Sequence, residues 1–99
     1  MTDADSEAVL EALFSTIESR KEELPEESYT TSLLTHEKGE NAVLEKLGEE
    51  STEILLAAKD DDSEELVAES ADFLYHLLVL LSMKGMEPAD VLAELESRF

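Results

Sequence analysis

One continuous stretch decides the fold: residues 40–83, which read ENAVLEKLGEESTEILLAAKDDDSEELVAESADFLYHLLVLLSM. Its apolar residues recur every three or four positions, as in an amphipathic helix, and the alternation typical of a half-buried strand is not sustained. Asp60-Asp61-Asp62 interrupts the pattern with side chains that suit a turn and a helix N-terminus. The sequence therefore predicts helices at about Glu40–Lys59 and Ser63–Met83, and the short loop between them requires antiparallel packing.

Further helices are predicted on both sides of this hairpin. The first runs from about Asp5 to Glu23, because Pro25 prevents its continuation. A last helix begins near Pro88, beyond the stop at Gly85, and reaches about Arg98. The apolar face of the first helix is expected to contain Val9, Leu10, Leu13, Phe14 and Ile17.

A short additional segment opens at Ser28-Tyr29-Thr30 and ends around Thr35 to Gly39, in a polar loop. The predicted fold class is therefore all-α, an antiparallel bundle of four to five helices in a single domain spanning residues 1–99.

Composition excludes several classes of function. The 99 residues include 26 Asp and Glu against 7 Lys and Arg, a formal net charge of −19, which repels nucleic-acid backbones and anionic lipid surfaces. Without cysteine there is no disulfide, zinc–thiolate site or thiol nucleophile. The N-terminus lacks a secretory-signal pattern, and the longest apolar run, Phe73–Met83, is far shorter than the roughly 20 residues of a membrane span. We therefore expect a cytoplasmic protein that binds neither nucleic acid nor membrane.

A few acidic residues occupy helix positions where a core would need apolar side chains. Glu50 interrupts the apolar stripe of the segment 40–59, and Glu53 lies one turn further on. Glu69 and Asp72 take corresponding positions in the segment 63–83. In an antiparallel hairpin, residues at the same height have numbers with a constant sum, and 50 with 72 and 53 with 69 both give twice the number of Asp61. The sequence therefore predicts that Glu50 faces Asp72 and that Glu53 faces Glu69.

Four carboxylates brought together repel one another and require a cation. Oxygen ligands select hard ions such as Mg²⁺, which also binds water and substrate phosphates. The alternative is that these acids are ordinary surface charges. The run from Asp60 to Glu65 does not predict a calcium loop, because Glu65 and Ala71 occupy positions that require Gly and Glu.

At these residues the sequence resembles the all-α, MazG-like nucleoside-triphosphate pyrophosphohydrolases, whose signature is E-E-x-x-E followed by E-x-x-D. More narrowly it resembles the phosphoribosyl-ATP pyrophosphohydrolases of histidine biosynthesis, over about residues 13–98. That resemblance rests on four segments: Ser28-Tyr29-Thr30, Lys46-Leu47-Gly48-Glu49-Glu50, Leu56-Ala57-Ala58-Lys59 and the run DFLYHLLVLL at 72–81.

The resemblance implies Mg²⁺-dependent hydrolysis of the α–β phosphoanhydride of phosphoribosyl-ATP, which releases pyrophosphate and phosphoribosyl-AMP, and it implies a homodimer. It makes Glu50, Glu53, Glu69 and Asp72 metal ligands, and it makes Glu49 a further ligand or the group that orients the attacking water, so that the catalytic set is Glu49, Glu50 and Glu53.

Substrate contacts are expected from the few cations, chiefly Lys46, Lys38 and Lys59, and from the short segment at Tyr29 and Thr30. For Lys46 the alternative is a surface ion pair, and for Tyr29 and Thr30 a capping or core role. His76, one turn beyond Asp72, either supports a ligand carboxylate as a hydrogen-bond donor or is a satisfied core histidine.

The segment 63–83 is apolar around almost its full circumference, which predicts dimerisation through this helix. The charge of −19 exceeds the needs of one site and suggests adaptation to a salt-rich cytosol, as in halophilic proteins. Two other functions stay open from the sequence: a general (d)NTP pyrophosphatase with the same metal site, and an acidic helical interaction module without catalysis.

Overall fold

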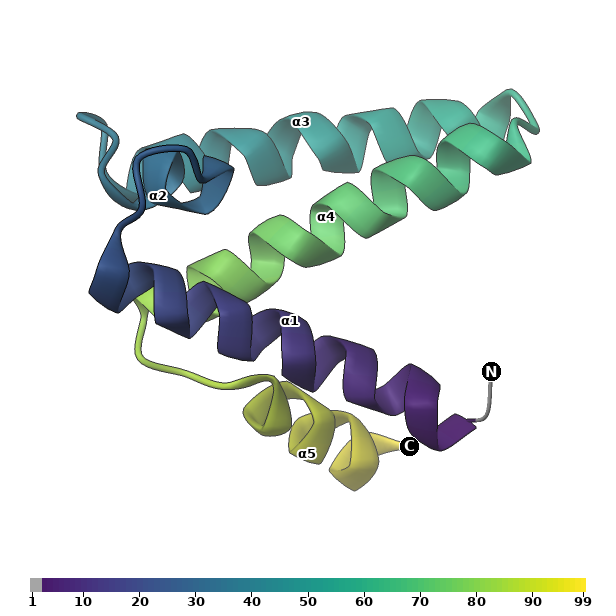
Figure 1. The fold of residues 1–99 in the computed structure, drawn as a ribbon. Helices are drawn as coiled ribbons and strands as arrows, with labels where there is room; N and C mark the ends of the chain where they lie inside the picture. The colour runs from purple at the N-terminus through teal and green to yellow at the C-terminus, as the bar shows by residue number, and fades with distance from the viewer. Residues whose placement is uncertain (1–2) are drawn as a thin grey trace.

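A computed structural model describes residues 3–99, which form helices and no strand (Figure 1). The elements are α1 (Asp3–Glu23), α2 (Tyr29–Leu34), α3 (Glu40–Lys59), α4 (Ser63–Met83) and α5 (Pro88–Arg98). The predicted all-α class and the predicted ends of both long helices are confirmed.

The turn between α3 and α4 has the sharpness that the aspartate run predicts. Asp61 adopts a positive φ of 54°, a conformation that Asp tolerates better than most residues. Asp62 is the N-cap of α4, and its carboxylate accepts a hydrogen bond of 3.1 Å from the backbone N–H of Glu65. The chain therefore reverses within three residues, and α3 packs along α4 in the most extensive contact between any two helices of the described residues.

The other helix boundaries follow from local chemistry. Gly39, with φ of 60°, begins α3, and Gly85, with φ of 73°, follows the end of α4. Pro88 occupies the first turn of α5, where Glu87 and Asp90 form a reciprocal capping box. These residues are the breakers that the sequence predicts.

The core lies where α1, α2 and α3 meet the C-terminal half of α4. It contains Phe14, Ile17, Leu33, Val43, Leu78, Val79 and Leu81. By length and composition α4 is apolar enough to cross a membrane, and in this fold it is the helix that contacts both α3 and α1. One expectation for α1 is wrong: Val9 is 52% exposed, because it lies at the edge of the face that buries Phe14 and Ile17.

The molecule is more extended than its length requires. Its radius of gyration is 14.6 Å, against about 12.6 Å for a compact domain of this length. Figure 1 shows the reason: the tip of the α3–α4 hairpin projects beyond α1 and α5. Part of each long helix therefore lacks a covering layer within one chain.

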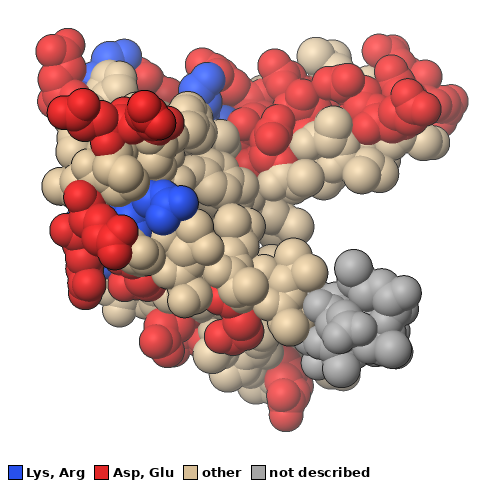
Figure 2. Space-filling model, in the orientation of Figure 1, with Lys and Arg blue, Asp and Glu red and all other residues tan. Residues whose placement is uncertain are grey.

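Acidic side chains dominate the surface, as Figure 2 shows over α3 and along the outer edges of the molecule, with few basic groups between them. At a net charge of −19 this surface repels itself, and the repulsion opposes the compact state.

We therefore expect the melting temperature to rise when KCl is increased from dilute buffer to molar concentration, because the Debye length falls from tens of ångströms to about 3 Å. Circular dichroism at 222 nm during heating measures this. The melting curve in the same buffer without added KCl provides the baseline. Equal melting temperatures at low and molar KCl would contradict the expectation.

Candidate active site

A buried carboxylate and a buried imidazole join α3 to α4. Glu50 is 8% exposed and His76 is 4% exposed, and His76 Nδ1 lies 2.8 Å from Glu50 Oε1. The same nitrogen lies 2.9 Å from the backbone carbonyl oxygen of Asp72, one turn earlier in α4. A carboxylate in the helix interface is costly unless it is hydrogen-bonded, and His76 supplies that bond. His76 is thus both a satisfied core histidine and a partner of a predicted ligand.

The short helix α2 reaches the same place from the other side. The Tyr29 hydroxyl lies 2.9 Å from His76 Nε2, and burial raises the pKa of this hydroxyl above its ordinary value. The hydroxyl of Thr30, a buried residue, pairs with that of Tyr75. Ser28 caps the helix by accepting a hydrogen bond from the N–H of Thr31. The structure therefore gives this segment capping and packing contacts, while the Tyr29 ring stays half exposed.

Glu53 and Glu69 meet across the hairpin, as the register predicts. A hydrogen bond with Glu53 is the main cause that raises the pKa of Glu69 to about 7, followed by loss of solvent and by a hydrogen bond with Glu65. Because the pKa in the folded state lies above its ordinary value, ionising Glu69 destabilises the fold increasingly as the pH rises toward and through 7. Glu65 was not expected here, although its spacing of four residues from Glu69 on one helix face is a usable signal.

The remaining signature acids are exposed. The backbone carbonyl of Asp72 shares His76 Nδ1 with Glu50, the Asp72 side chain is exposed, and Glu49 forms an ion pair of 3.5 Å with Lys46. Among residues 8–99, whose side chains the structure describes, no three side chains of Asp, Glu or His are arranged to hold one metal ion. The structure thus brings Glu53 and Glu69 together and places Glu50 beside the turn of α4 that carries Asp72, and these side-chain positions do not form one cluster of four.

The chemistry of the pairs nevertheless fits a hard cation. All the donors are carboxylate oxygens, and Glu69, whose pKa is raised chiefly by its hydrogen bond with Glu53, shares with it a proton that a divalent cation would replace. Glu53 and Asp72 are exposed, so rotation of their side chains requires no change in the helix packing.

The predicted cationic contacts lie at different distances along α3. Lys46 stands one turn before Glu50, and the Glu49 carboxylate raises its pKa. Lys38, in the loop before α3, pairs with Glu45 at 3.1 Å. Lys59 lies in the last turn of α3, nine residues beyond Glu50 and so about 14 Å along the helix axis. Of the three, Lys46 is the cation placed closest to the acidic pairs along the helix.

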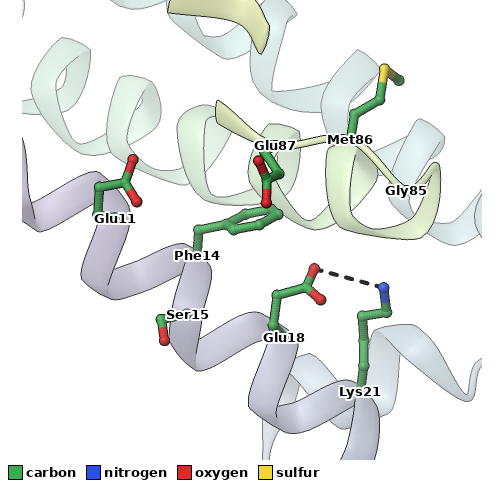
Figure 3. A pocket seen from close by; sticks show the side chains of 8 residues that line it. All are labelled: Glu11, Phe14, Ser15, Glu18, Lys21, Gly85, Met86 and Glu87. Atoms are coloured by element: carbon green, nitrogen blue, oxygen red, sulfur yellow. Dashed lines mark ion pairs between the residues drawn. The ribbon is translucent and has the colours of Figure 1, made fainter. Parts of the chain in front are cut away.

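Cavities lie elsewhere on the molecule. One of about 350 Å³ separates α1 from the loop at Gly85 to Glu87, and Figure 3 shows Phe14, Glu18 and Lys21 along its α1 wall. Its polar groups satisfy one another: Ser82 Oγ donates to Glu18 at 2.6 Å, and Lys21 Nζ donates to the Ser82 carbonyl oxygen at 3.0 Å. Glu53 and Asp72 lie on an exposed face of the helix pair, outside these cavities.

The sequence matches known proteins over almost its whole length. The profile of the family described as phosphoribosyl-ATP pyrophosphohydrolase matches residues 10–99. Proteins named phosphoribosyl-ATP pyrophosphatase are similar to this chain: one from Haloarcula marismortui, 68% identical over 95% of this chain and 96% of its own, and one from Natronomonas pharaonis, 73% identical over 95% and 93%. A third, from Haloquadratum walsbyi, is 58% identical over 99% of both chains. The facing acids of α3 and α4 thus stand in a chain that belongs to the phosphoribosyl-ATP pyrophosphohydrolase family.

Proposed function

We propose that this enzyme hydrolyses the α–β phosphoanhydride of phosphoribosyl-ATP to phosphoribosyl-AMP and pyrophosphate, the second step of histidine biosynthesis. The single observation that carries the proposal is the meeting of Glu53 with Glu69 across the hairpin, where a hydrogen bond between the two carboxyl groups and loss of solvent raise the pKa of Glu69 to about 7. A carboxyl group with a pKa perturbed by a second carboxyl group is an arrangement typical of functional sites. The names of the similar proteins supply the substrate.

The cofactor that fits this donor set is Mg²⁺. Glu50, Glu53, Glu69 and Asp72 would hold it, and when bound it offsets the negative charge of the phosphates and of the phosphorus centre under attack. Glu50 is the best anchored of the four, because its Oε1 is already hydrogen-bonded to His76. Glu53, Glu69 and Asp72 adjust to the ion from the more open side of the helix pair.

The chain itself binds the substrate and orients the water. Glu49, exposed beside the acidic pairs, is the carboxylate available to accept a proton from the attacking water. Its ion-pair partner Lys46 can exchange that contact for a substrate phosphate, and Lys38 and Lys59 add positive charge at either end of α3. The half-exposed Tyr29 is joined to Glu50 through His76, with the buried Thr30 next to it, and this segment is the proposed further contact to the substrate. Direct attack by water needs no covalent intermediate.

The expected activity is release of pyrophosphate from phosphoribosyl-ATP in molar KCl with Mg²⁺, abolished by EDTA. ATP and dNTPs serve as comparison substrates under the same conditions. Turnover of these common triphosphates at a similar kcat/KM would indicate a general pyrophosphatase instead, and no turnover by folded protein would contradict the proposal.

Glu53→Gln should weaken Mg²⁺ binding and lower kcat at least 10-fold, because it removes one ligand charge. The matched control is Glu94→Gln, which removes one exposed carboxylate from α5, away from the hairpin acids. Isothermal titration with Mg²⁺ and the pyrophosphate assay measure the two effects. An acidic interaction module would make the two variants indistinguishable.

Mg²⁺ affinity of the unmodified protein should also increase with pH through about 7. Protons compete with the ion for Glu69 below its raised pKa, and binding releases that proton. Titrations at pH 6 and pH 8 in two buffers of different ionisation enthalpy count the protons released. An affinity that does not change with pH would show that Glu69 is not a ligand.

We further propose that the enzyme is a homodimer. One chain exposes 7008 Å², against about 5600 Å² for a globular monomer of 11.0 kDa, and the excess exceeds the roughly 800 Å² that each partner buries in a standard interface. Large apolar side chains are exposed on the hairpin and on α5, among them Leu55, Leu56, Val67, Leu74 and Leu95. Leu74 also borders an apolar groove of about 150 Å³ between α4, α5 and α1.

Leu74→Glu should therefore shift the protein from dimer to monomer, because a charge enters the apolar face of α4. Ser97→Glu adds the same charge at an exposed position of α5 and should leave the mass unchanged. Light scattering after size-exclusion chromatography in molar KCl measures the mass. A monomeric unmodified protein, or a dimeric Leu74→Glu variant, would count against this interface.

A further inference from the structure

One imidazole links three elements of the molecule. His76 of α4 contacts Glu50 of α3 through Nδ1 at 2.8 Å and Tyr29 of α2 through Nε2 at 2.9 Å. The residues lie 26 and 47 positions apart in the sequence, so tertiary packing alone brings them together. His76 is almost completely buried, and both of its ring nitrogens are occupied.

The surroundings of the ring fix where its hydrogen lies. Nδ1 faces two acceptors, the Glu50 carboxylate and the Asp72 carbonyl oxygen, and so it must carry a hydrogen. Nε2 faces the Tyr29 hydroxyl, which donates to a neutral ring and accepts from a charged one. The Tyr29 contact is therefore maintained in either protonation state of His76.

The contact at Nε2 decides how Nδ1 is aimed. With Nδ1 alone bound, the ring is free to favour the Asp72 carbonyl oxygen of its own helix over the carboxylate on α3. The Tyr29 hydroxyl holds the opposite side of the ring and so keeps the Nδ1 hydrogen shared with Glu50. The Ser28 cap fixes the first turn of α2, and Tyr29 is the first residue of that turn.

We propose that Tyr29 is a positioning residue that acts through His76 to hold the Glu50 carboxylate in one orientation, with Oε2 left for the cation and substrate. This proposal rests on the function proposed above. The hydroxyl of Tyr29 is then engaged with His76, and only the exposed ring of Tyr29 is available for contact with the substrate. The proposal also makes the docking of α2 a condition for an ordered acidic site.

Nitrogen NMR tests the hydrogen-bond relay without any assay of activity. The chain has two histidines, and they should carry their hydrogens on different nitrogens. His36 Nδ1 accepts a hydrogen bond of 3.1 Å from the N–H of Lys38, so neutral His36 carries its hydrogen on Nε2. In long-range ¹H–¹⁵N spectra at slightly alkaline pH, His76 should show a protonated Nδ1. A neutral His76 ring with its hydrogen on Nε2 would overturn the proposal whether or not the enzyme is active.

Two matched variants separate Tyr29 from its neighbour. Tyr29→Phe should move the Nε2 shift of His76 toward that of an unbonded nitrogen, whereas Tyr75→Phe, which removes the same atom from a ring 6.0 Å away, should leave Nε2 hydrogen-bonded. Tyr29→Phe should also weaken Mg²⁺ binding about 10-fold, as is typical when a group that orients a ligand is removed. Equal effects of the two variants on the His76 spectrum would contradict the assignment.

A double-mutant cycle shows whether Tyr29 acts through His76. His76→Asn retains a donor near the place of Nδ1 and has no atom at the place of Nε2. In this background Tyr29→Phe should change neither Mg²⁺ affinity nor kcat, whereas in the unmodified chain it should lower kcat about 10-fold with KM nearly constant. A loss that is the same in both backgrounds, or one that appears only in KM, would show direct substrate contact instead.

Discussion

The three-residue turn between α3 and α4 is the constraint on which the other features depend. The cap at Asp62 and the left-handed backbone of Asp61 give the turn one defined conformation, so the register along the whole hairpin is fixed. Glu53 consequently meets Glu69, and Glu50 meets the turn of α4 that carries Asp72 and His76. Inserting or deleting one residue in this turn would shift the register of α4 against α3. Each acid would then face a different residue, because successive residues on a helix are 100° apart.

The acids of the hairpin lie in two environments: an inner level at Glu50, which is buried, and an outer level at Glu53 and Glu69, which are more exposed. At the inner level the Glu50 carboxylate is compensated by the His76 imidazole and excluded from water. At the outer level a hydrogen bond between Glu53 and Glu69, together with loss of solvent, raises the pKa of Glu69 to about 7, so ionising Glu69 costs stability as the pH rises. The inner pair therefore stabilises the packing of α3 on α4, while the outer pair weakens it. Such a destabilising cluster on a stable support is the arrangement expected where a ligand supplies the missing charge.

Helix ends and register could be predicted from the sequence because short-range chemistry determines them. Pro25, Gly39, the Asp60–Asp62 run and Pro88 act on their immediate neighbours. The contacts of Tyr29 with His76 and of Ser82 with Glu18 could not be predicted, since they depend on how α2 and α1 dock over more than 40 intervening residues. The convergence of four carboxylates failed for a related reason: register sets the height of a side chain, while its rotamer depends on charge and solvent.

The apolar and acidic parts of the surface oppose each other in assembly. The exposed leucines of α4 and α5 favour a second copy, yet two chains that each carry −19 repel one another over the distance of a Debye length. At high ionic strength this length is shorter than a side chain, so only contacts at the interface remain and the apolar area decides the outcome. The three similar proteins named above come from halophilic organisms. Salt therefore acts on folding and on association through the same charges, and the acidic surface is compatible with an apolar interface only where salt is abundant.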